Sequence, residues 1–177
     1  MAIASYILSF LICLTFSSIV LSDYCTYTIS VKTGTESHAG TDAVVSLKFS
    51  DLMETPIDIP VLENYGVMEK GHDYFENGNL DIFKYTGSCF STYPICFMKL
   101  SHNNGGEHSG WYVDYVEIET HGGQTKYPKQ HFLVGQWLAY DEQPYKITTC
   151  RERCALYPWA EPEEGQEGRP TFLARKN

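Results

Sequence analysis

The residues best suited to chemistry in this sequence are one serine within a glycine-bounded segment, six histidines and six cysteines. The serine of Gly106–Gly110 (GEHSG) stands one position later than in the Gly-x-Ser-x-Gly turn that exposes a hydrolase nucleophile. The histidines are scattered singly, and the sequence contains no His-Glu-x-x-His pair, P-loop or Gly-x-Gly-x-x-Gly motif. These patterns predict a protein without catalytic residues.

Two aspartates stand in polar turns directly before predicted strands. Asp42 follows Gly40 and Thr41, and Asp73 follows a Gly-His pair. Calcium takes about six to eight oxygens from carboxylates, carbonyls and water on such loops. Asp42, Asp73 and the carbonyl of Gly40 therefore form a candidate part of a calcium shell. The alternative is that both carboxylates accept N–H groups of their own turns.

The N-terminus has the pattern of a targeting segment. Residues 1–22 carry no charged side chain, and Ile7–Leu21 is almost wholly apolar. This run is shorter than the roughly 20 apolar residues of a membrane span, and Val20 and Ser22 suit the positions before a signal peptidase cut. We predict a signal peptide over residues 1–22, with an uncleaved anchor as the alternative. The predicted location is the secretory pathway, either the endoplasmic reticulum or the extracellular space (apoplast).

Removal of that segment also removes one cysteine and leaves five. In the secretory pathway these are expected to form disulfides rather than a metal site, and an odd number leaves one thiol over. Cys89 and Cys96 bracket a short loop, which favours a local bridge, and a Cys25–Cys154 bridge would tie the ends of the domain together. Cys150 is then unpaired, or it replaces Cys154 as the partner of Cys25.

The segments that position these residues are predicted to be strands, separated by Gly-, Asn- and Asp-rich turns. Tyr27, Ile29 and Val31 alternate with polar residues, which is the period of a half-buried strand. Further strands are predicted over residues 43–49, 57–62, 80–85, 95–102, 112–120, 130–134 and 145–150. No long 3.6-residue apolar period appears, so the fold class is all-β, an antiparallel β-sandwich over residues 23–154. Trp111 and Trp137 adjoin apolar segments and are expected in its core.

Residues 155–177 are rich in Pro, Gly and Glu and are predicted to form a disordered acidic/polar tail. The formal net charge of −9 argues against a nucleic-acid partner. The same charge disfavours attraction to bare anionic lipid and so favours a protein partner, or membrane contact through calcium or apolar loops. Tyr65, Tyr93 and Trp159 lie in turn-rich stretches and are candidate membrane or partner contacts.

Five segments in this order resemble a PLAT/LH2 domain, the β-sandwich module of lipoxygenases, animal lipases, polycystins and a clostridial toxin. They are Tyr27–Gly34 (YTISVKTG), Ala39–Ala43 (AGTDA), Gly78–Phe83 (GNLDIF), His102–Gly105 (HNNG) and Gly110–Val116 (GWYVDYV). The resemblance runs from about residue 25 to residue 154 and implies two four-stranded sheets. With the leader and the paired cysteines, the chain is similar to plant stand-alone PLAT proteins.

The resemblance also implies a function. Such plant proteins are associated with the endoplasmic reticulum and with abiotic and biotic stress tolerance, and the domain serves membrane lipid or protein association rather than catalysis. In calcium-binding members the matching ligands fall at Gly40, Thr41, Asp42 and, in the turn before the Gly78–Phe83 segment, Asp73. Here a histidine, His38, stands where such a member carries an aspartate. The alternative is an accessory subunit of a lipid-metabolising enzyme or a small secreted hydrolase using Ser109 or a histidine.

Overall fold

The computed structural model describes residues 24–53, 56–90, 93–123 and 126–156. The predicted signal peptide and nearly all of the predicted tail lie outside the described residues. The described elements are β1 (Tyr24–Thr33), β2 (Val45–Ser50), β3 (Ile57–Ile59), η1 (Leu62–Tyr65), β4 (Leu80–Ser88), β5 (Phe97–His102), β6 (Trp111–His121), β7 (Lys129–Leu138), β8 (Thr148–Glu152) and η2 (Cys154–Leu156).

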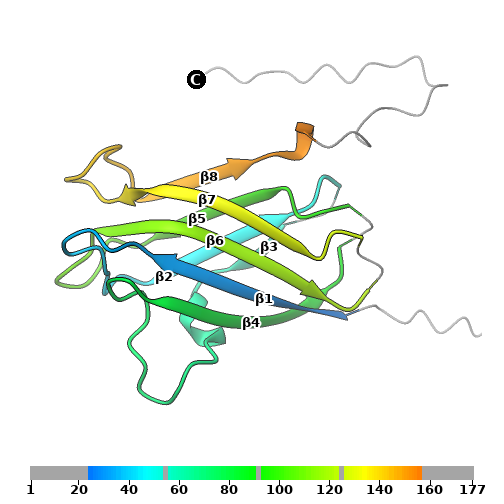
Figure 1. Cartoon of the computed structure of the whole chain (residues 1–177), viewed down its shortest axis with the longest axis horizontal. Coiled ribbons are helices and arrows are strands. Elements are labelled where there is room, and N and C mark those ends of the chain that lie inside the picture. The colour runs from blue at the N-terminus through cyan, green and yellow to red at the C-terminus, as the bar shows by residue number, and fades with distance from the viewer. Residues whose placement is uncertain (1–23, 54–55, 91–92, 124–125, 157–177) are drawn as a thin grey trace, which may run out of the picture.

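These strands form two four-stranded sheets that pack face to face (Figure 1). The first sheet has the order β4-β1-β6-β7 and the second the order β3-β2-β5-β8. Each pair of neighbouring strands is antiparallel. The predicted all-β class and the two four-stranded sheets are therefore confirmed.

Each segment predicted from apolar alternation overlaps one strand, and the main differences lie near the C-terminal end. β7 continues to Leu138 and so includes Trp137, whereas β8 begins only at Thr148. Residues 139–147 between them form a loop, in which Tyr145 has a φ of 61°. That left-handed conformation is incompatible with a strand, so the strand predicted from residue 145 starts three residues later.

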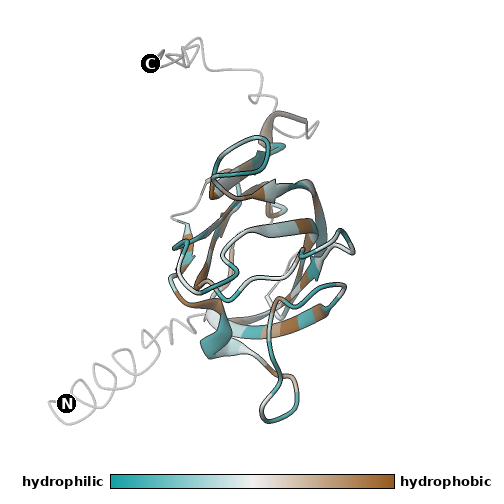
Figure 2. Cartoon of the chain, turned by 90° about the vertical axis from the view of Figure 1, so that its left-hand side faces the viewer, coloured by the Kyte–Doolittle hydropathy of each residue, from teal (hydrophilic) through white to brown (hydrophobic). Residues whose placement is uncertain are grey.

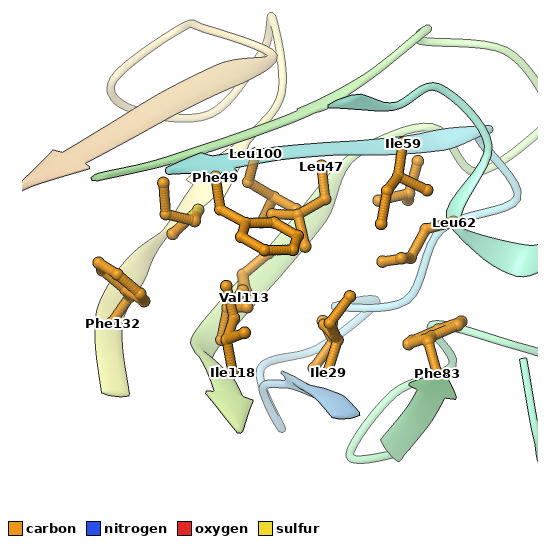
Figure 3. Packing of buried hydrophobic residues seen from close by; sticks show 14 of the residues in the cluster. Ile29, Leu47, Phe49, Ile59, Leu62, Phe83, Leu100, Val113, Ile118 and Phe132 are labelled. Carbon is orange, nitrogen blue, oxygen red and sulfur yellow. The ribbon is translucent and has the colours of Figure 1, made fainter. Parts of the chain in front are cut away.

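Both sheets turn alternate side chains inward to build one core. Along β1 every second residue from Cys25 to Thr33 is buried. In Figure 3, Ile29 and Ile118 of the first sheet point toward Leu47, Phe49 and neighbouring side chains of the second. Because each sheet has one buried and one solvated face, the period-two pattern in the sequence is a direct consequence of this packing.

The two tryptophans predicted for the core have different environments. Trp111 is fully buried, packs edge-on against Phe75, and donates a hydrogen bond from Nε1 to Thr33 Oγ1 at 3.0 Å. Trp137 is only half-buried, and its ring meets that of Tyr112, with 5.5 Å between the ring centroids. The core prediction is confirmed for Trp111 and is wrong for Trp137, because the second ring lies at the margin of the sandwich.

Two disulfides join the cysteines, but with a pairing that differs from the predicted one. Cys25 pairs with Cys89, and Cys96 pairs with Cys154. The predicted Cys25–Cys154 and Cys89–Cys96 bridges are therefore wrong. Cys150 is exposed and free, as the first alternative expected.

The strand order explains this pairing. Cys25 lies on β1 opposite Gly87 of β4, so Cys89, two residues further on, is beside it. Cys96 directly precedes β5, and its carbonyl accepts a hydrogen bond of 2.9 Å from the backbone N–H of Arg153, which follows β8. Cys154 is thus adjacent to Cys96, and each bridge joins two neighbouring strands of one sheet.

Candidate functional site

Four loops gather at one end of the sandwich, the end that faces the viewer in Figure 2. The strand register requires this, because Thr33, at the end of β1, pairs with β6 two residues from its start, and Leu138 is opposite Trp111. The loops are residues 34–44, 66–79, 103–110 and 139–147. We call this region the loop end; it contains the candidate calcium ligands and the Gly106–Gly110 segment.

The first loop is locked to its neighbours by the Gly40–Asp42 segment. Thr41 is buried; its hydroxyl donates to the Ser109 carbonyl at 3.0 Å and accepts from the Ala43 N–H at 3.1 Å. Gly40 approaches the next loop so closely that a Cβ there would lie 3.0 Å from the backbone nitrogen of Asn77. Thr41 thus has a structural role, and Gly40 is required for the contact between the loops.

Asp42 links the first loop to the third. Its backbone N–H donates to the His108 carbonyl at 3.0 Å, and its carboxylate accepts from the His108 N–H at 3.1 Å. The His108 ring lies 3.5 Å from the same carboxylate but is largely exposed. Gly106 has a φ of 86°, and a Cβ there would be 2.5 Å from that of Asp42, so only glycine fits.

The second loop is held from inside by a buried carboxylate. Asp81 on β4 is fully buried; one oxygen is 2.5 Å from His72 Nε2, and the other accepts from the Phe75 N–H at 2.7 Å. The His72 ring packs edge-on against Tyr74. Because both partners of Asp81 belong to the loop it faces, this one side chain fixes the position of residues 72–75.

Between the first three loops lies a pocket of about 320 Å³. It is lined by His38, Gly40, Thr41, Asp42, Glu76, Asn77 and His108. Gly40, Thr41 and Asp42 are predicted site residues, whereas Glu76 and Asn77 are not. Glu76 and Asn77 directly precede the Gly78–Phe83 segment of the PLAT/LH2 resemblance, and this position is the sequence feature that could have identified them.

Asp73 does not line this pocket. It is exposed and lies near Glu63 of η1, where burial and then the negative charge of Asp73 raise the pKa of the Glu63 carboxyl. The structure therefore separates Asp73 from Asp42, and Glu76 is the second acidic residue of the pocket. Within the described parts of the chain, no three His, Cys, Asp or Glu side chains converge as a ready metal site.

The predicted contact aromatics are not the most exposed ones. Tyr65 is half-buried and packs edge-on against Tyr85, and Tyr93 is also half-buried. Their role as membrane or partner contacts stays a prediction. Trp159 lies outside the described residues. The exposed aromatics of the loop end are instead Tyr140 and Tyr145, at 61% and 57% exposure.

A buried histidine closes the loop end between the sheets. His102 is 4% exposed; its Nε2–H donates to the Leu138 carbonyl at 2.8 Å, and its Nδ1 accepts from the Asn104 N–H at 3.2 Å. This arrangement needs the neutral ring, and burial lowers the pKa of His102 despite the bond to Leu138. The ring thus ties the third and fourth loops together only while it is uncharged.

We expect this histidine to make stability fall in mild acid. The pKa of His102 is lower in the folded than in the unfolded chain, so its contribution is complete above about pH 6.5 and is lost as the pH falls toward the folded value. In urea unfolding at successive pH values, the wild type should lose more stability below about pH 6.5 than His102→Gln. The exposed His108→Gln variant is the control and should follow the wild type; identical curves for all three proteins would contradict the role of His102.

The comparisons agree with this architecture. The model of the PLAT/LH2 domain family matches residues 27–151, so the chain belongs to the PLAT/LH2 domain family. Among curated proteins it is similar to PLAT domain-containing protein 2 of Arabidopsis thaliana, 39% identical over 82% of this chain and 81% of that protein. PLAT domain-containing protein 1 of the same plant is 41% identical, covering 75% of this chain and 73% of that one. The resemblance to plant stand-alone PLAT proteins is thereby confirmed.

Among solved structures, the fold is similar to part of a LOX variant crystallised with arachidonate. The TM-score is 0.51 with 24% identity, and the match covers 72% of this chain but only 16% of the LOX chain. At this identity the likeness concerns the fold alone. In the described parts of the chain, no helix is both long and apolar enough to cross a membrane.

Proposed function

We propose that the protein is a non-catalytic PLAT domain protein of the secretory pathway, which associates through its loop end with a membrane or a protein client and thereby promotes tolerance of abiotic and biotic stress. The observation that carries the association is the exposed pair Tyr140 and Tyr145 on the β7–β8 loop. Tyrosine has an apolar ring and a polar tip, which suits both membrane interfaces and protein partners.

The two disulfides support the choice of compartment. Cys25–Cys89 and Cys96–Cys154 need an oxidising environment to form and persist. The stress role is supported by the similarity to the plant PLAT domain-containing proteins, and it is tested by the survival under stress of plants that lack the protein.

Charge restricts how the loop end can meet a membrane. Asp141 and Glu142 stand between the two exposed tyrosines, and the whole chain carries a net charge of −9. Anionic lipid would therefore be repelled unless calcium neutralises the loop end. A protein client with a basic surface meets no such barrier.

Vesicle flotation tests the membrane version. We expect the wild type to float with phosphatidylserine-containing vesicles in calcium and to float several-fold less in a calcium chelator, since the cation would offset the acidic loops. The double variant Tyr140→Ser/Tyr145→Ser should lose most of the bound fraction, because burial of two aromatic rings is removed.

Tyr24→Ser is the matched control, since Tyr24 is 68% exposed but lies at the opposite end of β1. It should float as the wild type does. Absence of flotation under either condition would reject membrane association and leave protein clients, which affinity purification from stressed tissue would identify.

Calcium is proposed to bind weakly in the pocket through the carboxylates of Asp42 and Glu76, with Gly40 at its wall. Only two carboxylates are present, and one Asp42 oxygen already accepts the His108 N–H. We therefore expect titration calorimetry to give a dissociation constant of about 0.1–1 mM, the range of weak extracellular sites. Asp42→Asn and Glu76→Gln should each weaken binding at least threefold, whereas Asp73→Asn should not; the reverse order would return the site to Asp73.

A further inference from the structure

The outer face of the second sheet carries a pair of lysines that no feature of the loop end explains. Lys48 on β2 and Lys99 on β5 are direct partners in the strand register, and both side chains point away from the core. Directly opposite residues have Cβ atoms about 5 Å apart, and like charges in this position destabilise a sheet. The pair is therefore an unfavourable element in the free protein.

Among the described residues, carboxylates relieve only one of the two charges. Asp58 on β3 lies 2.8 Å from the Lys48 ammonium, and both side chains are partly exposed. On the other side, Lys99 is opposite Cys150 of β8, which brings no carboxylate. Glu152, two residues further along β8, is diagonal to Lys99, and no ion pair joins them within the described chain. Lys99 therefore has no ion-pair partner among the described residues, although the Asp58 carboxylate lines the same hollow.

Hydroxyl groups border the same spot. Ser46 and Ser101 form the next outward pair along β2 and β5. A hollow of about 200 Å³ lies between them and the lysines, and the Asp58 carboxylate that pairs with Lys48 also lines it. The Thr148 hydroxyl donates to the Leu100 carbonyl, so Ser101 is left to donate to Thr148. Among the described residues, Ser46 makes a single long hydrogen bond of 3.3 Å to the Ser101 carbonyl, so its hydroxyl can turn toward a ligand.

We infer that this hollow binds a phosphate group, with Lys48 and Lys99 as the charged donors and Ser46 as a hydroxyl donor. A dianionic tetrahedral group accepts several hydrogen bonds, and lysine binds it as a compact point charge. The net charge of −9 opposes the approach of an extended anionic surface. The ligand is therefore a small soluble phosphate monoester rather than a membrane headgroup.

The test uses the opposite effects of Lys99 on the free and bound protein. Scanning calorimetry compares inorganic phosphate with chloride at equal ionic strength, near neutral pH. In saturating phosphate, at about ten times the dissociation constant, the wild-type melting temperature should rise by about 3–5 °C above its value in chloride. Lys99→Ala should melt about 1–3 °C higher than the wild type in chloride, because the like-charge pair is gone. It should also lose the gain from phosphate.

Lys84→Ala is the matched control, because Lys84 is an exposed lysine of β4 on the other sheet. It should keep the full gain from phosphate, as should Lys99→Arg, which retains the charge. Phosphate also stabilises proteins by exclusion from their surface, and that effect would be equal in all variants. An equal gain in the wild type and Lys99→Ala would overturn the site. Lys99-dependent sedimentation with phosphatidic acid vesicles would overturn the choice of a soluble ligand.

Discussion

Replacing Cys25 and Cys89 together with alanine should lower the free energy of unfolding by about 4 kcal/mol, among the largest losses that we expect from removing a single feature of this domain. The bridge joins residues 64 apart in sequence, so its loss frees a long loop in the unfolded chain. Cys25 is also 1% exposed and belongs to the core, where the truncation removes packing. Urea unfolding measures the change.

Two comparisons make this result specific to the pairing. Cys150→Ala should be nearly neutral, because that cysteine is exposed and free. Cys96→Ala/Cys154→Ala should cost a similar amount to the first double variant, since its loop of 58 residues is almost as long. Peptide mapping of the unreduced protein should recover Cys25 linked to Cys89; recovery of Cys89 linked to Cys96 would contradict the structure.

The disulfide pairing could not be predicted from the sequence, although the strand positions could. Strand positions could be predicted because one face of every strand meets the core, and a period of two records this locally in each segment. Which cysteines meet depends on which strands are neighbours. β1 lies beside β4 and β6 in one sheet, whereas β8 belongs to the other. That order is set by packing over the whole chain, and no local pattern contains it.

The candidate site likewise contains some residues that could be predicted from the sequence and others that could not. The Gly40–Asp42 segment could be found because its residues are consecutive. Glu76 and Asn77 join it only through the close approach at Gly40, across more than thirty residues of chain. Apolar alternation also misleads on β4, where Leu80 is 45% exposed and the charged Asp81 is fully buried. A carboxylate can be buried at this position because the folded loop supplies its hydrogen-bond donors.

That buried carboxylate leads to the second large effect. Asp81→Ala should destabilise the protein by about 3 kcal/mol, because the Phe75 N–H and the His72 ring lose their shared partner inside the fold. The loop of residues 72–79, which carries Glu76 and Asn77 into the pocket, is then free to move. The calcium affinity proposed for the pocket should therefore fall together with stability. Urea unfolding measures the loss of stability, amide hydrogen exchange measures the opening of the loop, and titration calorimetry measures the calcium affinity.

Conservative variants distinguish loss of the hydrogen bonds from loss of packing. Asp81→Asn keeps the shape and one carbonyl oxygen for the Phe75 N–H, so its cost should be about half that of the alanine variant. Asp58→Asn removes an exposed carboxylate that is ion-paired with Lys48, and it should change stability by less than about 1 kcal/mol. If Asp81→Ala and Asp58→Asn had equal effects, burial would not determine the role of Asp81. If loop exchange stayed slow in Asp81→Ala, contacts around Gly40 and Thr41 would be sufficient to hold the pocket.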